Sequence, residues 1–217
     1  MRKIIVQEFL TLDGVMQGPG GPKEDLSGGF QYGGWVAPYF NAEPDPAFDA
    51  IMQNWMQPSD ILLGKNTFQI FESYWPTHAE DWPGINDVNK YVLSTSLEHS
   101  DWQNTIFLKS IDEIINLKAS GEGNIRVYGS AAVVQALFKY ELVDELRLLT
   151  FPIILGVGKR LFNHESIPAA FQLIDHLASS NGVVFAYYQR AGAVKSGTIG
   201  ERSSVFVFFL SYVCILL

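Results

Sequence analysis

Residues 125–139 read IRVYGSAAVVQALFK, in which a short apolar run, a glycine-serine turn and a stretch with helical spacing follow one another. Such a unit is typical of parallel sheets, because the chain can return to a parallel strand only through a long crossover, usually a helix. The same alternation recurs earlier: residues 61–63 precede a predicted helix at 66–73, and the runs 91–93 and 106–108 precede one at 110–118. The pattern predicts an α/β fold with a mixed, mostly parallel sheet that helices cover on both faces.

The flanking segments extend this core. Residues 3–10 (KIIVQEFL) predict a buried first strand, and residues 47–56 carry apolar side chains at the spacing of one helical face. Between them, residues 18–34 contain seven glycines and two prolines and therefore predict a long loop. Four later runs predict strands with little helix between them, and so an antiparallel finish: 145–150, 152–155, 171–176 and 183–190.

The pattern predicts one domain over residues 1–192 and a separate tail over residues 193–217. Residues 193–204 (AVKSGTIGERSS) have the composition of a flexible linker, and residues 205–217 (VFVFFLSYVCILL) are mostly apolar. Thirteen helical residues reach roughly 20 Å, short of the ~30 Å hydrocarbon core of a bilayer. We therefore favour three alternatives over a membrane anchor: a frayed appendage, a strand docked on the domain, or read-through sequence. We expect the tail to lie outside the fold.

Composition excludes several function classes. The chain has 15 Lys and Arg against 23 Asp and Glu, a net charge of −8, which disfavours nucleic acid as a partner. Its single cysteine, Cys214, cannot form an intrachain disulfide framework or a cysteine-based zinc site, and the four histidines show no ligand spacing. We therefore predict no metal site and a cytoplasmic protein. The sequence also lacks a Gly-x-Ser-x-Gly nucleophile elbow, which disfavours a hydrolase.

Three turns could bind an anion, because each follows a predicted parallel strand at the sheet edge where α/β proteins bind ligands. They are Gly64-Lys65-Asn66-Thr67, Ser94-Thr95-Ser96 and Gly129-Ser130-Ala131. Taken singly, each could also be an ordinary turn, a polar loop or a helix cap. The segment 156–160 (GVGKR) is either a fourth phosphate contact or a simple turn. No Gly-x-Gly-x-x-Gly fingerprint follows a strand and no Walker motif occurs, which argues against a Rossmann domain and a P-loop NTPase.

Taken together and in order, these segments resemble the dihydrofolate reductase superfamily, in the branch related to the reductase domain of bacterial riboflavin biosynthesis proteins. The resemblance runs from about residue 3 to residue 190. Its segments are TLDGV from residue 11, PGGPKEDLSGGFQYGGW from 19, LLGKNTFQIFESYWP from 62, KYVLSTSLE from 90, IRVYGSAAVVQALF from 125 and LVDELRLLTFPIILGVGKRLF from 142.

The resemblance implies a three-layer α/β/α domain that binds NADPH. Carried over, the family's cofactor turns correspond to Gly64, Lys65, Thr67, Ser94, Thr95, Gly129, Ser130 and Ala131. Asp13 and Gly14 would pass beside the nicotinamide, with Asp13 a candidate catalytic residue, and Trp35 would wall the substrate pocket. Asp49 lies near the helix carboxylate that assists protonation in dihydrofolate reductases, although a solvent-facing role is also open.

The resemblance says less about the substrate. Riboflavin reductases tend to carry a lysine where this chain has Gln7, and their deaminase domain is absent here. We expect an NADPH-dependent reductase of a small heterocyclic or carbonyl substrate; a nucleotide-binding or ligand-sensing domain without catalysis is the alternative. We also expect a homodimer, because residues 142–151 predict a strand that is apolar on both faces, although burial within one sheet would explain the same pattern.

Overall fold

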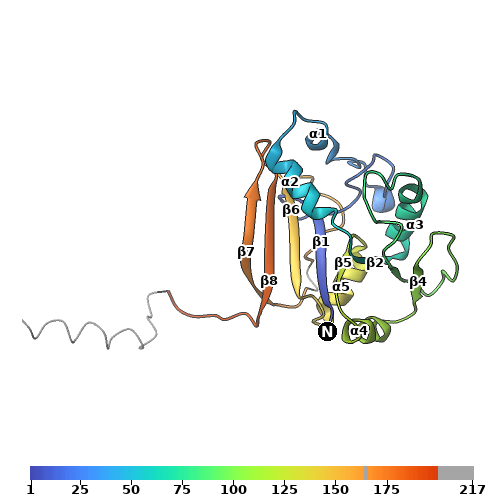
Figure 1. Ribbon diagram of the computed structural model, residues 1–217. Helices are drawn as coiled ribbons and strands as arrows, with labels where there is room; N and C mark the ends of the chain where they lie inside the picture. Colours follow the sequence, from blue (N-terminus) through green and yellow to red (C-terminus); the bar gives the residue numbers. More distant parts are fainter. Residues whose placement is uncertain (164–165, 200–217) are drawn as a thin grey trace, which may run out of the picture.

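A computed structural model describes residues 1–163 and 166–199. They form one eight-stranded sheet with helices on both faces (Figure 1). The strands are β1 (Lys3–Thr11), β2 (Asp60–Gly64), β3 (Lys90–Leu93), β4 (Thr105–Leu108), β5 (Asn124–Val127), β6 (Glu145–Phe151), β7 (Ala170–Ala178) and β8 (Val184–Gly192). The helices are α1 (Ala37–Phe40), α2 (Pro46–Trp55), α3 (Lys65–Tyr74), α4 (Ile111–Ala119) and α5 (Ala131–Lys139), with short 3-10 turns at Ser27–Gly29 and Trp75–Thr77.

The strand order is β4-β3-β2-β5-β1-β6-β8-β7. Neighbours from β4 to β6 pair in parallel, whereas β8 runs antiparallel to both β6 and β7. The predicted mixed, mostly parallel sheet with an antiparallel finish is therefore confirmed. β1 lies between β5 and β6, which come much later in the sequence, so the first strand of the chain forms the centre of the sheet.

Two apolar clusters, one on each face, hold the layers together. In β2, Leu62 belongs to the cluster that α4 and α5 cover, while its neighbours Ile61 and Leu63 belong to the cluster beneath α2 and α3. All three side chains are at most 1% exposed. Strands buried on both faces explain why the predicted runs are continuously apolar rather than alternating. The result is the expected α/β/α arrangement of three layers.

The strand predicted at residues 152–155 is wrong. Pro152 has no N–H to give to a sheet ladder, and the segment that follows is instead tied to the loop after β1. Leu12 N donates to Ile153 O at 2.8 Å, and Leu155 N donates to Asp13 Oδ1 at 3.2 Å. An apolar run after a proline thus forms a partly exposed loop rather than another strand.

β8 ends at Gly192, and residues 193–199 contain no helix or strand. The apolar run predicted to lie outside the fold, residues 205–217, is outside the described residues. Over residues 1–163 and 166–199, no helix has both the length and the apolar composition needed to cross a bilayer.

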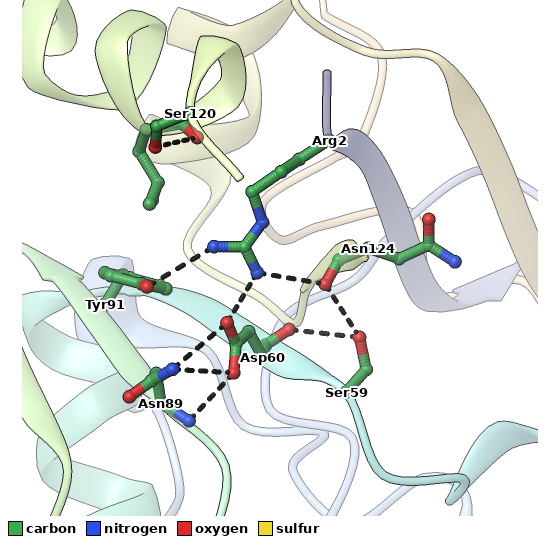
Figure 2. Close-up of polar contacts among 8 residues, drawn as sticks. Arg2, Ser59, Asp60, Asn89, Tyr91, Ser120 and Asn124 are labelled. Carbon is green, nitrogen blue, oxygen red and sulfur yellow. Dashed lines mark hydrogen bonds and ion pairs between the residues drawn. The ribbon is translucent and has the colours of Figure 1, made fainter. Parts of the chain in front are cut away.

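A polar network ties together the amino ends of four parallel strands (Figure 2). Arg2, which precedes β1, donates to Asp60 Oδ2 at 2.5 Å and to Tyr91 Oη at 3.3 Å. Asp60, the first residue of β2, also accepts hydrogen bonds from the backbone and side chain of Asn89, which precedes β3. A third contact joins Arg2 to the carbonyl of Asn124, where β5 begins. The network closes this edge of the sheet with matched charges.

We predict that Asp60→Ala lowers the free energy of unfolding by about 3 kcal/mol, because it leaves the charge of Arg2 buried without its partner. The side chains of Arg2 and Asp60 are only 8% and 19% exposed. Lys159→Ala is the control, since the pair Lys159–Asp25 is 43% and 26% exposed and its loss should cost less than about 1 kcal/mol. Urea unfolding followed by far-UV circular dichroism measures both. Equal losses in the two variants would contradict a special role for the Arg2 network.

Candidate functional site

Two of the predicted turns touch each other at the carboxyl edge of the sheet. A Cβ added to Gly64, the last residue of β2, would lie 2.1 Å from Ser130 Oγ, so only glycine fits there. A Cβ on Gly129, which closely follows β5, would lie 3.1 Å from the side chain of Thr67. The turns that begin α3 and α5 are therefore packed against one another, and the structure brings these four predicted residues together.

A pocket of about 400 Å³ opens beside these turns. It is lined by Lys65, Ser94, Thr95 and Ser96 from two of the predicted turns, by Leu93 at the end of β3, and by three residues that the sequence reasoning did not place at the site: Lys109, Ser110 and Ile111. Lys65 Nζ donates to Ser96 Oγ at 3.0 Å and Lys109 Nζ donates to the carbonyl of Leu97 at 2.7 Å. Both ammonium groups therefore have uncharged partners, and the pocket combines two cations with four hydroxyl groups.

Two of the helices that begin at this edge, α3 and α5, have free amino ends. Neither α3 nor α5 has a side-chain cap or an acidic residue in its first turn. By contrast, Asp45 caps α2 and Ser110 caps α4, and both of those helices carry acidic residues in the first turn. The first N–H groups of a helix are unsatisfied within it and carry partial positive charge. Two uncapped helix starts beside two lysines form a site suited to a phosphate or another anion.

The turn after β5 has an unusual backbone. Gly129 and Ser130 both have φ near +60°, and Ser130 is not a glycine. Gly129 N donates to Glu8 Oε1 at 2.7 Å, so this amide faces into the protein rather than toward a ligand. Burial raises the pKa of Glu8 to about 8, although the Gly129 N–H opposes that shift. The amides left to face a ligand are those of the first turn of α5, which includes the predicted residue Ala131.

Asp13 anchors two loops. Its carboxylate accepts hydrogen bonds from Thr11 Oγ1 at 2.6 Å, Gly156 N at 2.9 Å, Leu155 N at 3.2 Å and Arg160 Nη2 at 3.0 Å. Burial alone would raise the pKa of Asp13, but these donors outweigh it and hold the pKa well below its usual range. The side chain is therefore ionised at neutral pH and ties the loop after β1 to the loop after β6. Its catalytic role stays a prediction.

The other predicted residues have distinct surroundings. Gly14 has φ +76° and its carbonyl accepts from Leu161 N, so it shapes the loop after β1. Trp35 is 7% exposed, and its Nε1 donates to Gln17 O at 2.9 Å. It packs edge-on against Phe151 as part of the core beneath α2. Asp49 lies on the exposed face of α2, as the solvent-facing interpretation expects.

The glycine-rich loop forms a second pocket, of about 350 Å³, with the segment after β6. Phe30 from this loop (residues 18–34) and Gln17 just before it line the pocket together with Gly158 and Lys159. Lys159 Nζ pairs with Asp25 Oδ2 at 2.6 Å and its backbone N donates to Gln17 Oε1. The segment 156–160 is thus a turn that holds the glycine loop, the simpler of its two interpretations.

The family model of the RibD C-terminal domain matches residues 2–185. The chain belongs to this family. Protein YyaP of Bacillus subtilis (strain 168), which is itself uncharacterised, is 29% identical over 199 residues, covering 88% of this chain and 96% of YyaP.

Two solved structures share the fold of this RibD C-terminal domain. A protein of Shewanella sp. PV-4, provisionally named for riboflavin biosynthesis, superposes with a TM-score of 0.59 at 22% identity, over 87% of this chain and 98% of the other. Dihydrofolate reductase of Enterococcus faecalis, in complex with NADP(H) and RAB-propyl, superposes with a TM-score of 0.57 at 12% identity, over 87% and 96%. These likenesses confirm the dihydrofolate-reductase-like fold.

We predict that Asp13→Asn lowers the free energy of unfolding by about 1–2 kcal/mol at pH 7, because a neutral amide is a weaker acceptor for its donors. The folded-state pKa of Asp13 is depressed, so the ionised form stabilises the fold above the unfolded pKa of about 3.9. The difference from wild type should stay constant between pH 7 and 5 and shrink as the pH falls below about 4.

Asp49→Asn is the matched control, since that aspartate is exposed and the same exchange should change stability little at any pH. Denaturant unfolding at a series of pH values compares the three proteins. A pH-independent loss in Asp13→Asn would show that the charge of Asp13 is not what stabilises the loops.

Proposed function

We propose that this RibD C-terminal domain is an NADPH-dependent oxidoreductase acting on a small soluble substrate. The observation that carries the proposal lies at the carboxyl edge of the parallel sheet, where a pocket holds two lysines and four hydroxyl groups beside the uncapped start of α3. The uncapped start of α5 adjoins α3 through the contact between Gly64 and Ser130. Family membership and the fold shared with a reductase that binds NADP(H) support the same assignment. The nicotinamide would supply a hydride, and the chain would orient the cofactor and substrate.

The residues divide between the 2′-phosphate and the pyrophosphate of the cofactor. Lys65 and Lys109 are suited to the 2′-phosphate, because they bring positive charge to a pocket that is also rich in hydroxyl donors. The start of α5 is suited to the pyrophosphate, because its first N–H groups are uncapped. Ser130 precedes this helix and Ala131 is its first residue. The remaining predicted contacts shape the backbone or add hydroxyl donors: Gly14, Gly64, Thr67, Ser94, Thr95 and Gly129.

The substrate side differs from that of the riboflavin reductases. Gln7 replaces the lysine expected in those enzymes; it is 1% exposed, and its Nε2 donates to Trp55 O and Tyr128 Oη, both at 2.9 Å. A buried amide cannot supply the positive charge of a lysine. We therefore favour a small heterocyclic or carbonyl substrate, with Trp35 in its pocket wall, over the phosphoribosylaminouracil of riboflavin synthesis.

A nucleotide-binding or ligand-sensing domain without catalysis is the second candidate. The observation that favours it is the state of the two predicted acids, since Asp13 is held in its ionised form and Asp49 faces solvent. NADPH oxidation measured against dihydrofolate, other pterins, the riboflavin precursor and simple carbonyl compounds separates the two functions. Turnover of one substrate supports the reductase; tight NADPH binding without turnover of any supports the sensor.

We predict that Lys65→Ala and Lys109→Ala each weaken NADPH binding by roughly 10- to 100-fold, because each removes a charged hydrogen bond worth about 1.5–3 kcal/mol. NADH lacks the 2′-phosphate, so its affinity should barely change. Lys139→Ala, an exposed lysine at the far end of α5, is the control and should bind both cofactors as wild type does.

Nicotinamide fluorescence during titration measures these affinities, after circular dichroism has shown that each variant is folded. If a lysine variant loses as much affinity for NADH as for NADPH, that lysine does not contact the 2′-phosphate. Failure of the wild type to bind near-millimolar NADPH would overturn the proposed function itself.

The proposal includes a cytoplasmic homodimer. Residues 142–151 do not carry it, because β6 lies inside the sheet between β1 and β8 and its apolar faces are buried within one chain. The edge strand β7 supports the dimer instead, because its apolar residues Leu173, Ile174 and Leu177 are each at least 40% exposed. An apolar edge strand left open invites pairing with another chain, and a second copy would cover it.

We predict that the full chain and a version ending at Gly192 both scatter light as dimers at micromolar concentration. Leu173→Lys with Leu177→Lys should convert both to monomers, because charges would then have to be buried at the pairing edge. Ile106→Lys is the control, an apolar side chain that is 42% exposed on β4 at the other edge of the sheet. Monomeric wild-type protein, or a dimer that survives the double substitution, contradicts this interface.

A further inference from the structure

Glu8 lies at the point where the sheet opens. β1 pairs with β5 only as far as Val6 and Val127, whereas its pairing with β6 continues to Thr11 and Phe151. Beyond Val6, the side of β1 that faces β5 therefore has no strand partner. The carboxyl group of Glu8 bridges this gap, is 6% exposed, and accepts from Gly129 N at 2.7 Å. The gap coincides with the place where ligands bind in open α/β sheets, since the segments after β1 and β5 leave toward opposite faces.

The turn that Glu8 holds needs restraint. Ser130 has a left-handed backbone, which residues with a Cβ adopt rarely and keep only where surrounding contacts enforce it. Three contacts surround this turn: the Glu8 hydrogen bond, the packing of Gly64 against Ser130 and the packing of Thr67 against Gly129. Glu8 provides the one polar contact among them. The direction in which α5 begins, and hence the aim of its free N–H groups, depends on this turn.

We propose that Glu8 is a positioning residue of the dinucleotide site, whose hydrogen bond to Gly129 N sets the left-handed turn and so aims the start of α5 at the ligand. The inference rests on the proposed function. It assigns Glu8 no contact with the reacting atoms. It also explains why a carboxyl group stands at a strand position whose neighbours on the same face, Val6 and Leu10, are apolar and buried.

The protonation state of Glu8 agrees with this role. Burial raises its pKa to about 8, so the neutral form predominates at pH 7. A neutral carboxyl group still accepts the Gly129 N–H through its carbonyl oxygen and places no negative charge beside bound phosphates. Glutamine has the same shape and the same acceptor, and therefore should replace Glu8 in this function, whereas leucine fills the space without accepting a hydrogen bond.

The experiment compares Glu8→Gln and Glu8→Leu with wild type by two readouts. The first is the amide proton shift of Gly129 in the ¹⁵N-labelled protein without nucleotide, which reports the hydrogen bond directly. The second is NADPH affinity by nicotinamide fluorescence. We expect Glu8→Gln to keep a downfield Gly129 amide and an affinity within ~3-fold of wild type, and Glu8→Leu to lose the downfield shift and at least ~10-fold in affinity.

Val6→Ala separates this effect from general destabilisation. Val6 lies two residues earlier on the same face and is fully buried, so its truncation lowers the melting temperature without touching the turn. Its NADPH affinity should equal that of wild type. Adding Ser130→Gly to Glu8→Leu should restore part of the lost affinity, because glycine adopts the left-handed turn without restraint.

The outcomes are distinguishable. Wild-type affinity in a folded Glu8→Leu protein overturns the positioning role alone. A loss of affinity in Glu8→Gln as large as in Glu8→Leu also overturns it, since the acceptor is retained. If Glu8→Leu does not fold, the Gly129 shift and affinity of Glu8→Gln still decide. If wild type binds no NADPH, the proposed function fails, while the Gly129 shifts still test whether Glu8 sets the turn.

Discussion

The contact between Gly64 and Ser130 is the constraint on which the site depends. With 2.1 Å between a hypothetical Gly64 Cβ and Ser130 Oγ, the turns after β2 and β5 have no slack between them. Those turns begin α3 and α5, which lie on opposite faces of the sheet. The contact therefore brings the positive ends of two helices from different layers to one point. Adjacent parallel strands place the turns side by side, and glycine lets them close.

The basic side chains at the two edges of the parallel sheet differ in whether they have an acidic partner. At the amino edge, Arg2 is neutralised by Asp60 within hydrogen-bond distance, so that edge is closed. At the carboxyl edge, Lys65 and Lys109 form no ion pair within residues 1–163 and 166–199 and contact only uncharged oxygens. In a protein with net charge −8, these two ammonium groups are therefore available to a bound anion. The asymmetry is what distinguishes a ligand edge from a structural edge.

The sequence predicted the turns better than the side chains around them. Strand ends and glycines are local signals, so Gly64, Ser94 and Gly129 could be placed from the sequence. Lys109 could not, because it follows β4, and only the pairing of β4 with β3 brings it beside Lys65. Glu8 escaped notice because no local signal in the strand predicted at residues 3–10 links its carboxyl group to the turn at Gly129. That contact depends on where β5 diverges from β1. The prediction of a strand at residues 152–155 was wrong because apolar side chains alone do not provide a neighbouring strand to hydrogen-bond with.

General acid–base catalysis is most efficient when the pKa of the catalytic group lies near the working pH. Asp13 is driven away from that range by four donors, and Asp49 faces solvent. Glu8 is moved toward it, yet its carboxyl group is committed to the turn that begins α5. Both carboxyl groups fix loops and turns: Asp13 joins the segments after β1 and β6, and Glu8 joins β1 to the turn after β5. Under the proposed function, the chain would therefore act by orienting the cofactor and the substrate, and the proton that accompanies the hydride would come from water.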